Sequence, residues 1–395
     1  MKQKILAIIL GLSLFYSCGL KTRSILHSGY VENEQFSDTI SFDYTYGVPI
    51  VNVKIDEEEY RFLFDTGAPT VIDISLAEKM KYHTLTEKKV FDSQGNREKE
   101  KFIKIPSLQI NSISFVNIGA VISNMNQTFE ISCLEIDGII GANLMEKAHW
   151  KIDYKKRELY FSSKPFPKPI NAYTLDFYPQ KNQRTPKVAI KLDAKTVKNI
   201  SVDTGSNGAI DLESKDFPDI LNNTKDIFVY GTASTGVYGR GENDIKTLSK
   251  IKNITLGNIV FHNQIVSFET NTSKTIGNQF LENYSVIFNW DEKKIYLSPI
   301  STYDYKNIQG FGFYTKMENG KLKVASVIEN SLADEFGIRP EMEIISINNQ
   351  TFENTIQNPC FYVFHTPFPK TNEIKVSFLI QNQKQTFTFY RQDFL

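Results

Sequence analysis

Two segments of the chain end an apolar strand pattern with the same three residues, Asp-Thr-Gly. The first contains Asp65, and the second contains Asp203, 138 positions later (203 − 65). A carboxylate at the end of an apolar strand is partly withdrawn from water, which costs free energy unless backbone N–H groups bond to it. The glycine permits a tight turn that presents such groups, and the threonine hydroxyl adds a local donor and acceptor. Each segment is therefore suited to hold one carboxylate rigidly.

A pair of such carboxylates could hydrolyse an amide bond. Two carboxyl groups about 3 Å apart cannot both ionise, so they share one proton and titrate as a unit. One can take a proton from water while the other donates a proton to the substrate carbonyl, without a metal or cofactor. Two alternatives remain: each Asp only caps a turn, or the acids act in a glycosidase, which also uses paired carboxylates.

An internal repeat suggests that the two acids come together. An apolar-apolar-Gly segment ends at Gly141 and another ends at Gly277, 136 positions later (277 − 141). Two hairpin patterns with charged turns, which contain Tyr160 and Tyr296, repeat the same offset. Landmarks in one order at a nearly constant offset indicate two copies of one unit of roughly 130 residues.

The elements that must position the acids read as strands. Alternating apolar runs cover 49–55, 102–110, 188–192 and 251–256, while helical patterns are short, at 75–81, 143–147 and 279–283. The chain has 29 Phe and 19 Tyr, which favours strands. Its 45 basic and 45 acidic residues leave no net charge, which argues against nucleic acid as a partner. We expect a mainly β protein.

The motifs Asp65-Thr-Gly-Ala and Asp203-Thr-Gly-Ser, each followed about 75 residues later by apolar-apolar-Gly, resemble the catalytic motifs of aspartic peptidases, particularly the compact retropepsin-like branch. The resemblance implies two pseudo-symmetric β lobes in one polypeptide, lobe one at 36–162 and lobe two at 170–299. It also implies an aspartic endopeptidase that acts as a monomer on peptide or protein substrates, with Asp65 and Asp203 as its catalytic pair and no metal.

The same resemblance assigns supporting residues. Thr66 and Thr204 would bridge the lobes, and Gly67 and Gly205 would donate N–H bonds to the carboxylates. Each lobe would also supply a flap over the substrate. The expected flaps are 91–99, with Gly95 at the tip, and 230–241, with Gly236 and Tyr238; ordinary solvated hairpins are the alternative.

Residues 305–395 have a different character and form a third, α+β domain. The segment Gly310-Phe311-Gly312-Phe313 resembles the carboxylate-binding loop of PDZ domains, and a short helix at 331–337 and strands to 390 follow. This resemblance implies capture of a C-terminal peptide. Three prolines within 359–369, where the groove helix belongs, depart from the pattern. The alternative is a structural appendage that covers an edge of lobe two.

Residues 1–18 are typical of an export signal, because a basic start precedes an apolar core at 5–16 that is too short to span a bilayer. Cys18, directly after this core, resembles the lipidated cysteine of bacterial lipoproteins; secretion without a lipid is the alternative. We expect a protein exported to the periplasm, anchored to a membrane or displayed at the cell surface.

Cys133 and Cys360 are the remaining cysteines, and they fall in different expected domains. We therefore expect two free thiols rather than a disulfide. The rival to a peptidase is a non-catalytic peptide-binding protein of the cell envelope, which would use the cleft and the PDZ-like loop.

Overall fold

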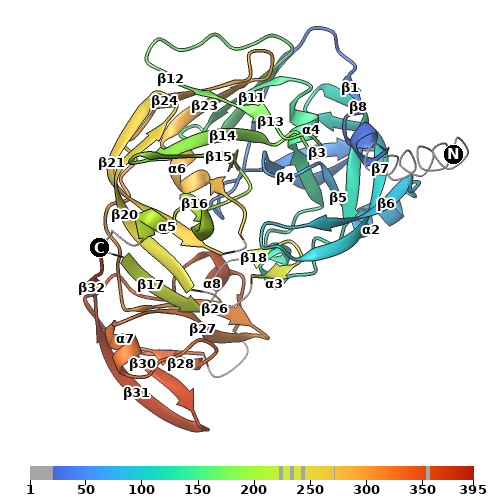
Figure 1. Ribbon diagram of the computed structural model, residues 1–395. Helices are drawn as coiled ribbons and strands as arrows, with labels where there is room; N and C mark the ends of the chain where they lie inside the picture. Colours follow the sequence, from blue (N-terminus) through green and yellow to red (C-terminus); the bar gives the residue numbers. More distant parts are fainter. Residues whose placement is uncertain (1–20, 222–225, 232–234, 242–244, 271, 353–355) are drawn as a thin grey trace, which may run out of the picture.

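The computed structural model describes residues 21–221, 226–231, 235–241, 245–270, 272–352 and 356–395. The chain is mainly β, as the sequence predicts. Figure 1 shows two β lobes side by side, with the C-terminal strands attached below lobe two. The helices are short and lie at the ends of strands: α2 (Ile74–Lys79), α3 (Phe129–Ser132), α4 (Ala142–Met145), η1 (Ser214–Asp216), α5 (Pro218–Leu221), α6 (Asn278–Leu281), α7 (Leu332–Glu335) and α8 (Phe361–Phe364).

Lobe one is built on an eight-stranded sheet with the order β1-β8-β5-β9-β4-β3-β7-β6. Most neighbours are antiparallel, but β4 pairs with β9, and β5 with β8, in parallel. The strands are β1 (Tyr30–Val31), β3 (Ile50–Ile55), β4 (Glu58–Asp65), β5 (Val71–Asp73), β6 (Thr86–Phe91), β7 (Arg97–Ile110), β8 (Ile113–Ser123) and β9 (Gly138–Gly141).

Lobe two repeats the parallel pairings of lobe one. Its β15 pairs with β22, and β16 with β21, in parallel, as β4–β9 and β5–β8 do in lobe one. The internal repeat of the sequence therefore corresponds to a repeat of topology. The strands are β13 (Tyr178–Pro179), β14 (Pro186–Leu192), β15 (Lys195–Val202), β16 (Ile210–Glu213), β17 (Asp226–Gly231), β18 (Thr235–Gly236), β19 (Gly239–Arg240), β20 (Ile245–Leu256), β21 (Ile259–Glu269) and β22 (Thr275–Ile276).

A six-stranded sheet joins the lobes, with the order β12-β24-β23-β10-β11-β2. At its centre β10 of lobe one pairs with β23 of lobe two. Beneath this sheet one apolar cluster contains Phe64 and Trp150 of lobe one together with Val202 and Phe288 of lobe two. The lobes therefore share a continuous core. The strands are β2 (Ser37–Ser41), β10 (His149–Asp153), β11 (Glu158–Ser162), β12 (Tyr173–Asp176), β23 (Tyr284–Asn289) and β24 (Lys294–Pro299).

The C-terminal domain continues the sheet of lobe two, because β17 pairs with β27 through Val229 and Ile328 and the next two residue pairs. It therefore covers an edge of that sheet. Its own core forms a separate apolar cluster. The strands are β25 (Gln309–Gly310), β26 (Phe313–Glu318), β27 (Lys321–Ile328), β28 (Glu343–Ile347), β29 (Gln350–Thr351), β30 (Glu373–Ile380), β31 (Gln383–Tyr390) and β32 (Gln392–Asp393).

Candidate active site

Asp65 and Asp203 lie at corresponding places in the two lobes. Asp65 is the last residue of β4, and Asp203 directly follows β15. A loop follows each acid, and the residue directly after each apolar-apolar-Gly segment is bonded to that loop. The Ala142 N–H donates to Ala68 O at 2.9 Å, and the Asn278 N–H donates to Ser206 O at 2.8 Å. Each loop is therefore held in place at the end of its apolar-apolar-Gly segment.

Thr66 and Thr204 tie the two loops together across the lobe boundary. The Thr66 N–H donates to Thr204 Oγ1 at 3.0 Å, and the Thr204 N–H donates to Thr66 Oγ1 at 3.0 Å. Each hydroxyl then donates to a carbonyl of the opposite lobe, Thr66 to Val202 O at 2.6 Å and Thr204 to Phe64 O at 2.8 Å. Both threonines are fully buried. This reciprocal set of bonds fixes the two loops relative to each other.

Each carboxylate is bound by the turn that follows it and faces the opposite lobe. The Gly67 N–H donates to Asp65 Oδ1 at 2.6 Å, and the Gly205 N–H donates to Asp203 Oδ1 at 2.9 Å. A Cβ at Gly67 would lie 2.4 Å from Asp203 Oδ2, and one at Gly205 would lie 2.4 Å from Asp65 Oδ2. Only glycine leaves room for the opposite acid at these two positions.

The electrostatics of the pair favour a shared proton. Burial and the neighbouring Asp203 charge raise the pKa of Asp65 well above its usual range. Burial also raises the pKa of Asp203, while the hydrogen bond with Asp65, the Gly205 N–H and the Lys187 cation oppose that rise. The two side chains are hydrogen-bonded to each other. Such a pair holds one proton between two carboxylates over a wide pH range.

Two buried asparagines support the loops, and the sequence analysis missed both. Asn143 accepts a bond from the Thr70 N–H at 2.7 Å. Asn278 donates to Thr204 O at 2.8 Å and to Gly47 O at 3.0 Å. Asn143 is the second residue after Gly141, and Asn278 is the first residue after Gly277. The two asparagines lie close to the apolar-apolar-Gly segments but not at matching positions of the repeat, so the repeat alone does not identify them.

The two expected flaps meet over the cleft. Gly95 lies in the turn between β6 and β7, and Gly236 and Tyr238 lie in the β18–β19 hairpin. The Tyr238 N–H donates to Asp92 Oδ2 at 3.0 Å, so the β18–β19 hairpin is bonded to the turn between β6 and β7. The Tyr238 hydroxyl is hydrogen-bonded to Glu100 on β7, and burial raises the pKa of this tyrosine.

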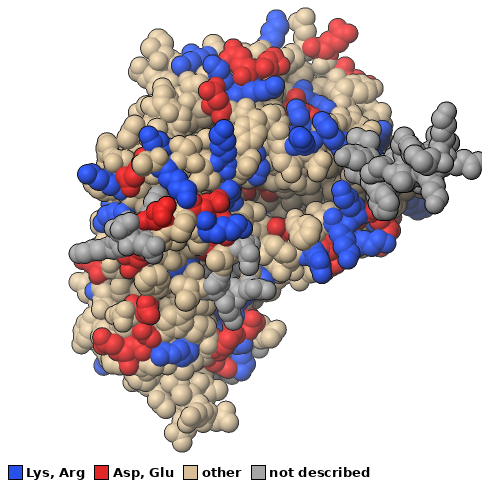
Figure 2. All heavy atoms as spheres, viewed as in Figure 1, with Lys and Arg blue, Asp and Glu red and all other residues tan. Residues whose placement is uncertain are grey.

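A cleft of about 580 Å³ runs between the lobes and contains both acids. Figure 2 shows basic and acidic side chains interspersed over the face in view, without a field of one sign. Most of the apolar lining comes from lobe one, which also contributes Asp92 and Glu130, whereas the lining from lobe two is mainly polar and charged. This apolar wall includes Val48, Leu63, Val71, Val121, Met125, Leu134, Ile136 and Ile139.

The segment expected to form a PDZ-like loop, 310–313, is not among the residues that line this cleft. Gly310 belongs to β25, and Phe311 and Phe313 are buried on either side of Gly312. The Phe368 ring packs against the rings of Phe311 and Phe313 at 5.4 and 5.1 Å. The segment with three prolines forms the four-residue helix α8.

The expectation of two free thiols is wrong. Cys133 and Cys360 form a disulfide that joins residues 227 positions apart, with their Cα atoms 5.3 Å from each other. The two cysteines fall in different expected domains, and only the packing of those domains brings them together. The C-terminal domain folds back so that α8, which begins after Cys360, lies beside α3 of lobe one, which ends before Cys133.

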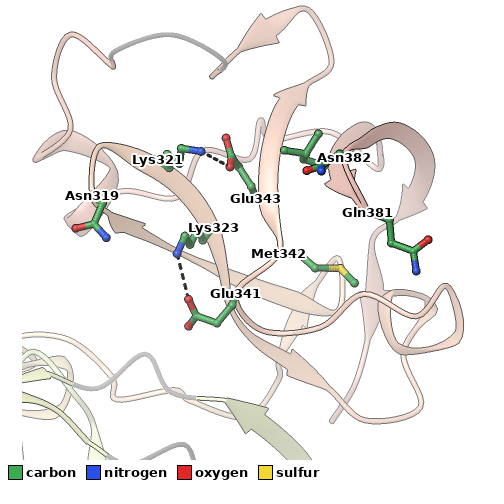
Figure 3. A pocket seen from close by; sticks show the side chains of 9 residues that line it. Asn319, Lys321, Lys323, Glu341, Met342, Glu343, Gln381 and Asn382 are labelled. Carbon is green, nitrogen blue, oxygen red and sulfur yellow. Dashed lines mark hydrogen bonds and ion pairs between the residues drawn. The ribbon is translucent and has the colours of Figure 1, made fainter.

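A second hollow, of about 480 Å³, lies on the C-terminal domain (Figure 3). Its charged groups are paired with one another: Lys321 Nζ lies 2.6 Å from Glu343 Oε2, and Lys323 Nζ lies 3.4 Å from Glu341 Oε2. We assign no function to this hollow, because its ion pairs already satisfy its charges.

Cys18 lies outside the described residues. None of the helices within the described ranges is long and apolar enough to cross a bilayer. In the same ranges, no three His, Cys, Asp or Glu side chains gather in a way that could bind a metal ion.

The match to known families falls on lobe one. No curated protein matches the chain. Residues 51–144, which include Asp65, Thr66 and Gly67 as well as Gly141 and Asn143, match the family model described as aspartyl protease. This match supports an aspartic-protease function for the chain.

Proposed function

We propose that this protein is an aspartic endopeptidase in which Asp65 and Asp203 act as one catalytic pair. The observation that carries the proposal is the reciprocal bonding of Thr66 and Thr204, which sets each acid against the glycine of the opposite loop. Two rigid carboxylates at one buried boundary can bind a single water between them.

The chemistry divides between the two acids. Asp65, whose pKa is raised well above its usual range, holds the shared proton, and Asp203 carries the charge. Asp203 takes a proton from the bound water, whose oxygen attacks the peptide carbonyl carbon. Asp65 donates its proton to the carbonyl oxygen, and the peptide carbonyl becomes a gem-diol. When the gem-diol collapses, one of its hydroxyl groups returns a proton to Asp65, the C–N bond breaks, and the nitrogen receives the proton held by Asp203.

The cleft accommodates a peptide in an extended conformation beneath the two flaps, and no cofactor takes part. An exported location, with Cys18 as a lipid anchor, fits this function. The Cys133–Cys360 disulfide supports the location, because such bonds persist in oxidising compartments outside the cytoplasm.

The test measures cleavage of a peptide library by the full chain, with and without pepstatin. We expect Asp65→Asn and Asp203→Asn each to lower kcat by about 10²–10⁴-fold, because either change removes the shared acid-base pair. Asp56→Asn is the matched control, since Asp56 is exposed in the turn before β4, at a φ of 49° that Asn also tolerates.

Two results would contradict the proposal. If the wild-type chain cleaves nothing but still binds peptides, the non-catalytic alternative holds. If only one of the two Asp→Asn variants loses activity, the lobes do not act as a pair.

A further inference from the structure

The C-terminal domain reaches into the cleft through helix α8. Val363 and Phe364 line the same cleft as Asp65 and Asp203. The Phe364 ring lies 4.2 Å from the Tyr46 ring, between ring centres, and packs against the apolar cluster of lobe one. A residue 299 positions after Asp65 (364 − 65) therefore completes a wall of the candidate active site.

Two separate attachments tie the C-terminal domain to the lobes near α8, and the first of them is made by the residue directly before this helix. The disulfide from Cys133 joins the residue directly before α8 to lobe one. Arg240, in the flap of lobe two, donates to Glu130 Oε1 on α3 at 3.0 Å and to Met317 O on β26 at 3.0 Å. The Arg240 side chain is only 19% exposed. Phe364 is therefore positioned before any ligand arrives, which lowers the entropic cost of binding against it.

The wall that Phe364 joins differs in chemistry from the wall across the cleft. It lies with the apolar side chains of lobe one, among them Val48. On the opposite wall, Lys246 Nζ lies 2.6 Å from Glu269 Oε1 and 3.6 Å from Asp211 Oδ1. An apolar side chain of a bound peptide is stabilised against the first wall. Against the second wall it would displace water from charged groups and offer them no hydrogen bond in return.

We propose that Phe364 is a specificity-determining residue of this peptidase. It forms part of a subsite that takes one large apolar side chain of an extended peptide substrate. The C-terminal domain thus selects substrate at the active-site cleft itself. The inference rests on the proposed peptidase function, and it names the substrate class that this wall of the cleft accepts.

The experiment compares wild type with Phe364→Ala on a library of peptides that vary one position at a time between Ala, Leu and Phe. We expect wild type to prefer Leu or Phe over Ala at one position. In the variant this ratio of kcat/KM falls by about tenfold or more, because the apolar wall is lost. The pH profile of the variant keeps the wild-type limbs, because the acid pair is unchanged.

Phe361→Ala is the matched control. Phe361 lies on the same helix, is 46% exposed and stacks on His365 rather than lining the cleft. We expect it to keep the wild-type preference. Phe364→Leu, which restores an apolar side chain, should recover most of the preference.

Fluorescence anisotropy of labelled peptides separates failure of this inference from failure of the proposed function. If wild type cleaves nothing but binds the apolar peptides, and Phe364→Ala alone weakens that binding, the subsite stands without the peptidase. Two results overturn the inference: an unchanged preference in Phe364→Ala, or an equal loss for all peptides in both Ala variants, which indicates damage to α8.

Discussion

The two carboxyl groups of the pair have different surroundings, although their loops begin with the same three residues. Lys187 on β14 pairs in register with Ser201, two residues before Asp203, and its Nζ donates to Ser201 Oγ at 2.5 Å. At the corresponding place in lobe one, Ile50 pairs with Leu63, two residues before Asp65. A cation therefore lies near Asp203 and an apolar side chain near Asp65. The positive charge lowers the pKa of Asp203 relative to its partner.

Replacing Lys187 with Met tests this difference. Without the cation the pKa of Asp203 rises, so the acid must be deprotonated at a higher pH before it can accept the proton of water. We expect the acidic limb of the kcat/KM profile to move to higher pH by roughly half a unit to one unit. Lys191→Met, at an exposed position of the same strand, is the control and should leave the limb in place. A shift to lower pH would show that Asp203 is not the charged member.

The elements that matter most to the site are β4 and β15, because the loops that follow them carry the acids. Neither strand reaches the other directly. The loops are joined by the hydroxyls and N–H groups of Thr66 and Thr204, all of which are buried. Because water is excluded there, a lost partner leaves a backbone group unsatisfied, which is costly.

Thr204→Val keeps the shape of the side chain and removes its hydroxyl. The Thr66 N–H and the Phe64 carbonyl then lose their partner, so we expect the free energy of unfolding to fall by about 1–3 kcal/mol. Activity should fall as well, because the acids are no longer aligned. Thr204→Ser retains the hydroxyl and should restore most of both. Urea denaturation and peptide cleavage measure the two effects, and wild-type stability in the Val variant would contradict the assigned bonds.

For the whole molecule, the C-terminal domain is joined to both lobes. Its β27 extends the sheet of lobe two through β17, and the Cys133–Cys360 disulfide joins it to lobe one. One alternative for this domain was that it covers an edge of lobe two. That alternative describes one of its two attachments. The other attachment closes a loop of 227 residues.

Removing the disulfide should lower the stability of the whole chain. For the double variant Cys133→Ser/Cys360→Ser we expect a loss of about 2–5 kcal/mol, because the unfolded chain is no longer constrained by the long loop. Thermal denaturation of wild type with and without reductant measures the effect. Reductant should lower the Tm of wild type and leave that of the double variant unchanged. Equal Tm values for wild type in both conditions would contradict the disulfide.

Much of the fold could be predicted because its signals are local. The alternation in 49–55 and 188–192 specifies β3 and β14, and Ser331 caps α7 because its hydroxyl oxygen accepts a hydrogen bond from the Asp334 N–H. A strand's period and a helix cap depend on neighbouring residues, so the sequence displays them directly.

What the sequence alone determined was the pair of Asp-Thr-Gly loops and the strands that carry them, because a repeated motif is visible without knowledge of packing. Only the tertiary structure decided that Lys187 lies near one acid, that Cys133 bonds Cys360, and that Phe364 enters the cleft. These residues meet through the docking of surfaces formed by distant segments. The energy of such contacts depends on how the lobes and the C-terminal domain pack, which no local pattern records.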